Sequence, residues 1–429
     1  MTKVLMLGWE FPPLLSGGLG IATYGIVKAL SPSTHIRLII PSAGEDLDLE
    51  GVNIIGLNKV TAEEINLERL RFNFSFPNTE VTELPITVSP YHHINDSLAA
   101  QHFGHFDALQ RGKRSIDIIH DIFSSKEVYG ASVMHKVYVF AKLAEELAAD
   151  GNFDVIHAHD WITYSAGINI KQRTGKPLIL HVHALETDRA GHATRNEIYW
   201  LERNAMMIAN RVIAVSQYTK DQIVLHYHID PAKIFVVHNG IDPSQPNRKE
   251  HILKDKLVAF LGRLTHQKGP QFLLETAEKV ARVYPRVKFV VAGTGDQFAH
   301  LLETSAYRKI GSKFIFAGFL SKARVNELLS MSDVYFMPSI SEPFGLTALE
   351  AAQHHVPSVI SIQSGAAEVM KSSLKADFWD TDKFANYIYA LLKYNVLSKT
   401  LADRSKNELD QLTWDHAAEK IRNIYSETR

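Results

Sequence analysis

The sequence of 429 residues contains no cysteine. This absence excludes disulfide bonds, catalysis by a thiolate, and zinc or iron–sulfur sites with cysteine ligands. It is compatible with a reducing compartment, in which disulfides seldom persist. We therefore expect a cytoplasmic protein whose chemistry depends on its charged, polar and histidine side chains.

The chain also lacks a surplus of either charge and lacks long apolar runs. Its 46 Lys and Arg residues balance 47 Asp and Glu residues, so the net charge does not attract nucleic acid. No apolar run reaches the roughly 18 residues of a membrane span. The apolar stretch between Met1 and Gly8 is too short for a signal peptide. Neither a nucleic-acid partner nor a transmembrane segment is expected.

Alternating strand and helix patterns predict an α/β protein. Residues 4–7 form a continuous apolar run, as in a strand buried on both faces, and residues 36–40 are predicted to be the next strand. Between them, apolar residues recur at helical spacing from Leu19 to Leu30. A strand–helix–strand unit implies a parallel crossover, and the same alternation returns over residues 257–362. Each half is therefore predicted to be a doubly wound, Rossmann-like domain.

A polar segment divides the chain into two predicted domains. Residues 242–256 are rich in charge and contain two prolines, which is typical of a linker. We expect an amino-terminal domain of residues 1–242 and a carboxyl-terminal domain of residues 243–429. Ligands of doubly wound domains bind at the carboxyl ends of the strands, so two facing domains predict a cleft between them.

Two glycine-containing loops follow predicted strands and have the composition of anion-binding sites. Gly17 and Gly18 precede a helix, where small residues and free N–H groups admit a phosphate, although a plain tight turn explains the same residues. Between Gly262 and Gly269, Arg263 and Lys268 can converge on a diphosphate, Arg through two donors and Lys as a point charge. Two solvated cations are the alternative.

The segment from Ser341 to Ala351 is the most informative. Glu342 is expected in a loop after a strand, and Glu350 about a turn and a half into the next helix. The first helical turn runs from Gly345 to Thr347, and N–H groups at such a position bind phosphate. Glu342 would then face a sugar and Glu350 a ribose. Two unrelated surface carboxylates at a helix start are the alternative.

Four histidines are predicted to lie on two strands. His157 and His159, and likewise His181 and His183, are two residues apart and therefore share one face of a strand. Such pairs can bind a metal, bond to a substrate hydroxyl, or be satisfied by the neighbouring backbone. The sequence leaves these three interpretations open.

Together these segments resemble the family 4 retaining glycosyltransferases of the GT-B fold, and among them the glycogen and starch synthases. The resemblance rests on the run from Gly262 to Gly269, on the run from Glu342 to Ala351, and on His157-Ala158-His159-Asp160-Trp161. It covers most of the chain and is weakest over residues 45–150. It implies two Rossmann-like domains facing a cleft, with a final helix over residues 408–429 that packs on the amino-terminal domain.

The resemblance assigns roles to individual residues. Four match the catalytic group, in which Arg and Lys grip the donor diphosphate while His and Glu lie near the donor sugar: His183, Arg263, Lys268 and Glu342. Seven match the donor-binding loops and helix start: Gly17, Gly18, Phe344, Gly345, Leu346, Thr347 and Glu350. Three match positions lining the cleft on the acceptor side: His157, His159 and Asp160.

The implied reaction transfers a sugar, expected to be glucose, from a nucleotide-diphosphate sugar to a hydroxyl with retention of configuration. The implied acceptor is an α-1,4-glucan, and the donor is ADP-glucose or UDP-glucose. Bacterial ADP-glucose-dependent synthases have a Lys just before the paired glycines, where this chain has Leu15 and Ser16. This difference disfavours ADP-glucose and leaves UDP-glucose or another nucleotide sugar open. No cofactor or metal is expected. The other glycosyltransferase architecture holds a metal on the diphosphate with an Asp-x-Asp motif, but the two such triplets here, at 46–48 and 380–382, are interpreted as a polar loop and a helix cap.

Other functions fit parts of the same pattern. A family 4 enzyme that builds a surface polysaccharide or a small glycoside is the main alternative, and the lack of a convincing basic amphipathic helix favours a soluble acceptor instead. A sugar-nucleotide epimerase of the same fold lacks the run from Gly262 to Gly269. A non-catalytic glucan-binding protein is disfavoured because Arg263, Lys268, Glu342 and Glu350 are all intact.

Overall fold

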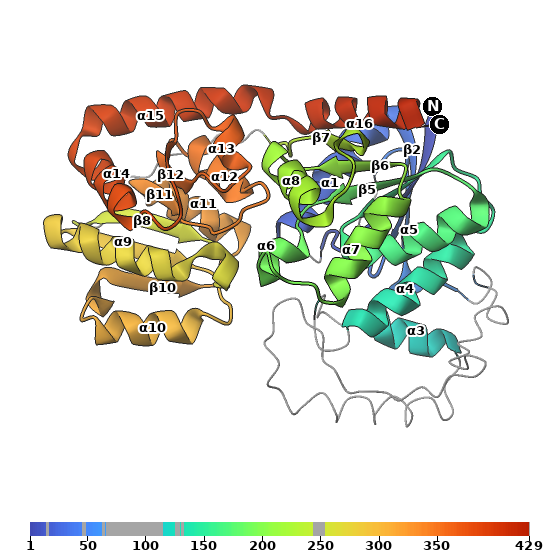
Figure 1. The fold of residues 1–429 in the computed structure, drawn as a ribbon, viewed down its shortest axis with the longest axis horizontal. Coiled ribbons are helices and arrows are strands. Elements are labelled where there is room, and N and C mark those ends of the chain that lie inside the picture. Colours follow the sequence, from blue (N-terminus) through green and yellow to red (C-terminus); the bar gives the residue numbers. More distant parts are fainter. Residues whose placement is uncertain are drawn as a thin grey trace.

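The computed structural model describes residues 1–13, 17–44, 49–61, 65, 115–124, 129, 133–242 and 254–428. Within these residues the chain forms two lobes, each built on a parallel sheet that is covered by helices (Figure 1). The amino-terminal lobe lies to the right in the figure, and the carboxyl-terminal lobe lies to the left. This arrangement confirms the predicted class, an α/β protein with two doubly wound domains.

The amino-terminal sheet has seven described strands in the order β3-β2-β1-β4-β5-β6-β7, all parallel to their neighbours. The strands are β1 (Thr2–Leu7), β2 (Thr34–Ile40), β3 (Val52–Gly56), β4 (Val155–His159), β5 (Leu178–Val182), β6 (Arg211–Ala214) and β7 (Ile234–Val236). The helices are α1 (Gly18–Leu30), α3 (Ser115–Ser124), α4 (Val133–Leu147), α5 (Trp161–Thr174), α6 (Glu186–Ala190), α7 (Glu197–Ile208) and α8 (Gln217–Gln222). The strand order reverses between β1 and β4, which is where ligands bind in such sheets.

The carboxyl-terminal sheet has six described strands in the order β10-β9-β8-β11-β12-β13, again all parallel. The strands are β8 (Lys256–Leu261), β9 (Val287–Ala292), β10 (Phe314–Gly318), β11 (Val334–Met337), β12 (Ser358–Ser361) and β13 (Leu374–Ala376). The helices are α9 (Pro270–Val283), α10 (Phe298–Tyr307), α11 (Lys322–Met331), α12 (Leu346–Gln353), α13 (Ala366–Val369), α14 (Thr381–Lys393), α15 (Asn395–Glu408) and α16 (Trp414–Thr428). The reversal here lies between β8 and β11.

Each sheet is buried on both faces, as the continuous apolar runs predict. Along β1, Val4 and Met6 face the core under α1, whereas Leu5 and Leu7 face the core under α4 and α5. Alternate residues of a strand point to opposite faces, so a strand covered on both sides needs apolar residues at every position. This requirement explains why β1 and β8 could be recognised from the sequence.

The final helix packs against the amino-terminal domain. Trp414, Ile421 and Tyr425 of α16 lie in the same apolar core as Ile26 of α1. A Cβ added to Gly25 of α1 would lie 2.3 Å from the Trp414 ring, so only glycine allows the two helices to pack this closely. Figure 1 shows α15 along the carboxyl-terminal lobe and α16 along the amino-terminal lobe.

Two smaller sequence interpretations can be compared with the structure. The Asp380 side chain accepts a hydrogen bond from the Lys383 N–H at 3.0 Å, so the triplet at 380–382 begins α14 as a helix cap. The triplet at 46–48, as well as Leu15 and Ser16, lies outside the described residues. No helix among the described residues is long and apolar enough to cross a membrane.

Candidate active site between the two domains

Glu342 lies in the loop between β11 and α12, and it is buried. Its carboxylate accepts a hydrogen bond from Lys268 Nζ at 2.5 Å and one from the Ser339 hydroxyl at 3.2 Å. Lys268 belongs to the loop between β8 and α9, so the two charges are brought together by two adjacent strands of the carboxyl-terminal sheet. The structure therefore joins two of the four residues predicted to be catalytic. Arg263 lies in the same loop as Lys268, and its side chain is exposed.

The amino-terminal end of α12 requires a glycine at position 345. Gly345 has φ +97°, which L side chains rarely adopt. A Cβ at this position would also lie 3.2 Å from Glu342 Cγ and 3.3 Å from the Ala366 Cβ. Gly345 provides no side-chain cap, and therefore the first N–H groups of α12, including those of Leu346 and Thr347, are available to an anion.

The amino-terminal ends of α1 and α12 meet across the two domains. A Cβ added to Gly18 would lie 3.8 Å from Leu346 Cδ1, and α1, like α12, has no side-chain cap. The Gly17 N–H donates to the Glu10 carboxylate at 3.1 Å. The start of each helix carries a partial positive charge, so the two ends together favour an anion between the domains.

Glu350 is paired with a lysine that the sequence analysis did not single out. Glu350 is buried in the second turn of α12, and its carboxylate forms an ion pair with Lys322 at the start of α11. Lys322 follows β10, which is not adjacent to β11 in the sheet. Its proximity to Glu350 is therefore a feature of the tertiary structure and is not apparent from the sequence. This ion pair joins the start of α11 to the second turn of α12.

Asp160 holds the segment that follows β5. Its Oδ1 accepts hydrogen bonds from the His183 N–H at 2.7 Å and from the Ala184 N–H at 3.2 Å. Asp160 has φ +61°, which is uncommon outside glycine, and it is buried. Burial raises the pKa of its carboxyl to about 6, whereas the two backbone donors favour the ionised form. Asp160 thus acts on His183 through the main chain.

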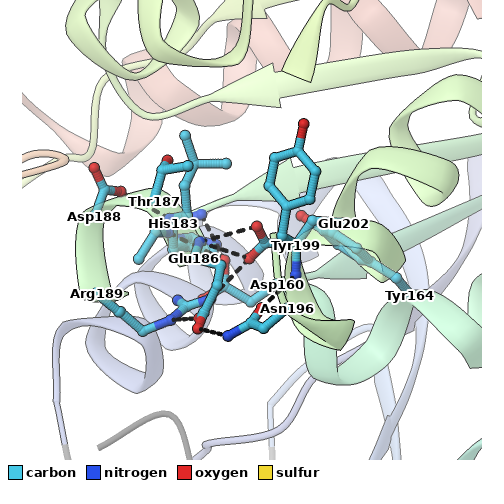
Figure 2. Close-up of polar contacts among 12 residues, drawn as sticks. Asp160, Tyr164, His183, Glu186, Thr187, Asp188, Arg189, Asn196, Tyr199 and Glu202 are labelled. Atoms are coloured by element: carbon cyan, nitrogen blue, oxygen red, sulfur yellow. Dashed lines mark hydrogen bonds and ion pairs between the residues drawn. The ribbon is translucent and has the colours of Figure 1, made fainter. Parts of the chain in front are cut away.

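A buried ion-pair network stabilises the same segment, and Figure 2 shows it around α6. Arg189 donates to Glu186 at 2.8 Å and to Glu202 of α7 at 2.7 Å. Tyr227 donates to Glu202 at 2.5 Å, and burial raises the pKa of the Glu202 carboxyl to about 8. Sequence reasoning missed this network because its members, from Glu186 to Tyr227, form no local motif. The ion pair between Arg189 and Glu186 offsets the cost of burying these two charges.

Hydrogen bonds between the two domains involve the residues on either side of Glu342. Asp188 of α6 accepts a hydrogen bond from the Ser341 hydroxyl at 2.5 Å. The Ser216 hydroxyl donates to the Pro343 carbonyl at 2.6 Å. Glu368 accepts hydrogen bonds from the Gln217 N–H at 2.9 Å and from the Tyr218 N–H at 2.5 Å, at the amino-terminal end of α8. The loop that carries Glu342 is therefore held on both sides by the amino-terminal domain.

The four histidines on β4 and β5 come together, as the shared strand faces predict. His157, His159 and His181 are fully buried, and His183 lies just beyond the end of β5. Burial lowers the pKa of His157 and of His183 to about 3, and it lowers those of His159 and His181 well below their ordinary value. All four imidazoles are therefore neutral near pH 7.

We expect replacement of His157 by phenylalanine to make folding less sensitive to acid. The unfolded histidine binds a proton below about pH 6.5, whereas the folded one stays neutral down to about 3. The stability of the native state is therefore full above pH 6.5 and falls as the pH decreases toward 3. In urea unfolding between pH 4 and 6, the free energy of unfolding of the variant should change less with pH than that of the wild type. The difference in slope should be about 1.4 kcal/mol per pH unit, because unfolding of the variant takes up one proton fewer. Equal slopes for both proteins would contradict a neutral, buried His157.

Comparison with known proteins agrees with this geometry. The family model described as "Glycosyl transferases group 1" matches residues 242–408, and the model described as "Glycosyltransferase Family 4" matches residues 110–245. The chain belongs to the family 4, group 1 glycosyltransferases. The predicted family and enzyme class, a nucleotide-sugar-dependent glycosyltransferase, are thereby confirmed.

Individual relatives of this glycosyltransferase span its whole length at low identity. It is 26% identical to an uncharacterised glycosyltransferase, MJ1607, of Methanocaldococcus jannaschii, over 99% of this chain and 97% of the relative. It is 24% identical to the glycogen synthase of Mycobacterium tuberculosis, over 86% of this chain and 80% of the relative. Its fold matches that of Anabaena HepE in complex with UDP and glucose, with a TM-score of 0.67, 16% identity and 100% coverage of both chains.

Proposed function

We propose that this glycosyltransferase moves glucose from a nucleotide-diphosphate glucose to the end of an α-1,4-glucan, with retention of the anomeric configuration. The observation that carries the proposal is the meeting of the two uncapped helix ends, of α1 and α12, beside the Lys268–Glu342 ion pair. Two positive helix ends and a lysine suit a diphosphate, and a buried carboxylate beside them suits a sugar.

The proposed roles follow the position of each residue. Lys268, with Arg263 in the same loop, stabilises charge on the leaving diphosphate, together with the N–H groups at the start of α12. Glu342 lies beside Lys268 and faces the donor sugar, and Phe344 precedes the glycine that begins α12. Glu350 accepts hydrogen bonds from the ribose hydroxyls, and His183 contacts the sugar from the amino-terminal domain.

The proposed chemistry requires charge stabilisation rather than a strong protein base. The bond between the sugar C1 and the phosphate oxygen breaks, and the acceptor oxygen bonds to C1 on the same face. The leaving phosphate takes the proton of the acceptor hydroxyl, so no side chain is consumed as a base. Closure of the two domains excludes water, which would otherwise hydrolyse the donor. Asp188, Ser216 and Glu368 provide hydrogen bonds that hold the domains together.

The glucan acceptor is supported by the resemblance to glycogen synthases, one of which aligns with 86% of this chain. The amino-terminal surface near His157, His159 and Asp160 is the proposed acceptor side. His157 and His159 are themselves buried, so they support this surface rather than contact the acceptor. UDP-glucose and ADP-glucose are the proposed donors, and HepE, which shares the fold, is known with UDP and glucose bound.

A donor and acceptor panel tests this function. Labelled ADP-, UDP- and GDP-glucose are incubated with the enzyme, alone and with glycogen or maltooligosaccharides, in the presence of EDTA. We expect label in the glucan from UDP- or ADP-glucose, with an α linkage by proton NMR, and no loss of rate in EDTA. Label transferred only to lipid or to a small alcohol would favour the surface-polysaccharide alternative. Activity that requires added manganese would contradict the metal-free mechanism.

A further inference from the structure

Ser341 lies next to Glu342, and two residues of the amino-terminal domain bind its side chain. The Ser341 hydroxyl donates to Asp188 Oδ1 at 2.5 Å, and its oxygen lies 2.9 Å from the Tyr218 hydroxyl. Asp188 belongs to α6 and Tyr218 to α8. Two separate elements of the amino-terminal domain therefore meet at one buried side chain of the carboxyl-terminal domain.

The direction of these hydrogen bonds follows from the number of hydrogens available. Asp188 also accepts a hydrogen bond from the Leu185 N–H at 2.8 Å, so both of its oxygens act as acceptors. A serine hydroxyl has one hydrogen, and Ser341 gives it to Asp188. The hydrogen between Tyr218 and Ser341 must then come from Tyr218. Burial raises the pKa of Tyr218 to about 12, so its hydroxyl keeps this proton near pH 7.

The main chain around Ser341 is joined to the loop that carries Lys268. The Ser341 carbonyl accepts a hydrogen bond from Gln267 Nε2 at 3.0 Å, and the Ile340 N–H donates to the Gln267 carbonyl at 2.9 Å. Gln267 precedes Lys268, and Ser341 precedes Glu342, the other member of the ion pair. Ser341 therefore contacts the amino-terminal domain through its side chain and the Lys268 loop through its main chain.

We propose that Ser341 is a positioning residue that couples contact between the domains to the placement of Lys268 and Glu342, and that Tyr218 acts through it. When the domains are in contact, Asp188 and Tyr218 hold Ser341 and thereby fix the two loops. When the domains separate, both side-chain hydrogen bonds break, and each loop is held only within its own domain. The consequence for catalysis rests on the proposed function, whereas the coupling itself does not.

Kinetics of Tyr218→Phe, Ser341→Ala and the double variant test whether Tyr218 acts through Ser341. Tyr218→Phe removes only the hydroxyl of a half-buried side chain. We expect kcat for sugar transfer to fall about 10-fold in Tyr218→Phe and about 10- to 100-fold in Ser341→Ala, because small misplacements of catalytic groups have large effects on rate. The KM for the donor should change little. Adding Tyr218→Phe to Ser341→Ala should cause no further loss.

Hydrogen–deuterium exchange measured by mass spectrometry tests the coupling without any assay of activity. We expect faster exchange than in the wild type in two segments, residues 263–269 and residues 339–345, in both single variants. The first segment belongs to the loop that Tyr218 does not contact through Ser341's side chain, so its faster exchange would show that the effect passes through the Ser341 main chain. Faster exchange confined to residues 339–345 would contradict the coupling.

Tyr199→Phe is the matched control. The Tyr199 hydroxyl donates to the His226 carbonyl at 2.9 Å, within the amino-terminal domain, so the variant also loses one hydroxyl hydrogen bond. Its kcat and its exchange in both segments should equal those of the wild type. The proposal is overturned if Tyr218→Phe behaves like this control, or if Tyr218→Phe costs as much in Ser341→Ala as in the wild type. A wild type that transfers no sugar, with variants that show the expected exchange, would contradict the proposed function and support the coupling.

Discussion

Replacement of Lys268 by methionine, or of Glu342 by glutamine, is expected to lower kcat about 10³-fold while the protein stays folded. Lys268 is proposed to stabilise charge on the leaving diphosphate, and loss of one such stabilising group costs a factor of this order. Glu342 is buried and accepts hydrogen bonds from both Lys268 and Ser339. Its amide replacement keeps the shape of the side chain but removes the charge beside the sugar. Initial rates of label transfer, together with circular dichroism, measure the effect.

The control for this prediction is Lys256→Met. Lys256 also forms an ion pair across two strands, with Asp333 at 2.7 Å. This pair lies at the start of β8, the end of the sheet opposite to the proposed site, and Lys256 is largely exposed. The control variant should keep wild-type kcat. A folded Lys268→Met or Glu342→Gln enzyme with near-normal turnover would show that the site has been assigned to the wrong residues.

Replacement of Trp414 by alanine is expected to destabilise the amino-terminal domain by about 3–5 kcal/mol, the usual cost of truncating a large buried aromatic residue. Trp414 begins α16 and is 6% exposed. Its ring packs on Gly25 of α1, and its backbone N–H would lie 2.2 Å from a Cβ at Gly240. The helix therefore fits a space shaped by two glycines, one of them at the boundary of the domains. Urea unfolding measures the loss of stability.

Trp379→Ala provides the comparison, because Trp379 is 57% exposed and should change the stability by no more than about 0.5 kcal/mol. Equal stabilities of the two variants would mean that α16 does not pack on the amino-terminal core. Selective exposure of the carboxyl-terminal residues to protease in Trp414→Ala would support the packing described here.

The parts of the fold that sequence predicted well are those in which one short segment determines its own structure. Helix α9 is such a segment, because the proline at its first position and its clear apolar period are both local signals. The short strand β13 and the helix α5 were missed. Neither shows a strong local pattern, and α5 is buried on more than one side because it packs against α4, α7 and the sheet.

The site residues also fall into two groups, those that a local motif identifies and those that only the tertiary structure brings together. Gly345 and Lys268 could be identified because their motifs are contiguous, and the strand order then brings Lys268 to Glu342. The Lys322 partner of Glu350 and the Arg189 partner of Glu202 could not be identified, since each depends on which strands or helices become neighbours. Long-range pairing of buried charges is a property of the tertiary structure, and a single sequence carries little trace of it.

The most direct test of the account is a crystal structure with the nucleoside diphosphate of whichever donor the panel selects. We expect the diphosphate to contact Lys268 and the N–H groups at the start of α12, and the ribose to contact Glu350. The predicted result is therefore a nucleotide that lies between the two helix ends near Gly18 and Leu346. A nucleotide that contacts neither Lys268 nor the first turn of α12 would contradict the central claim.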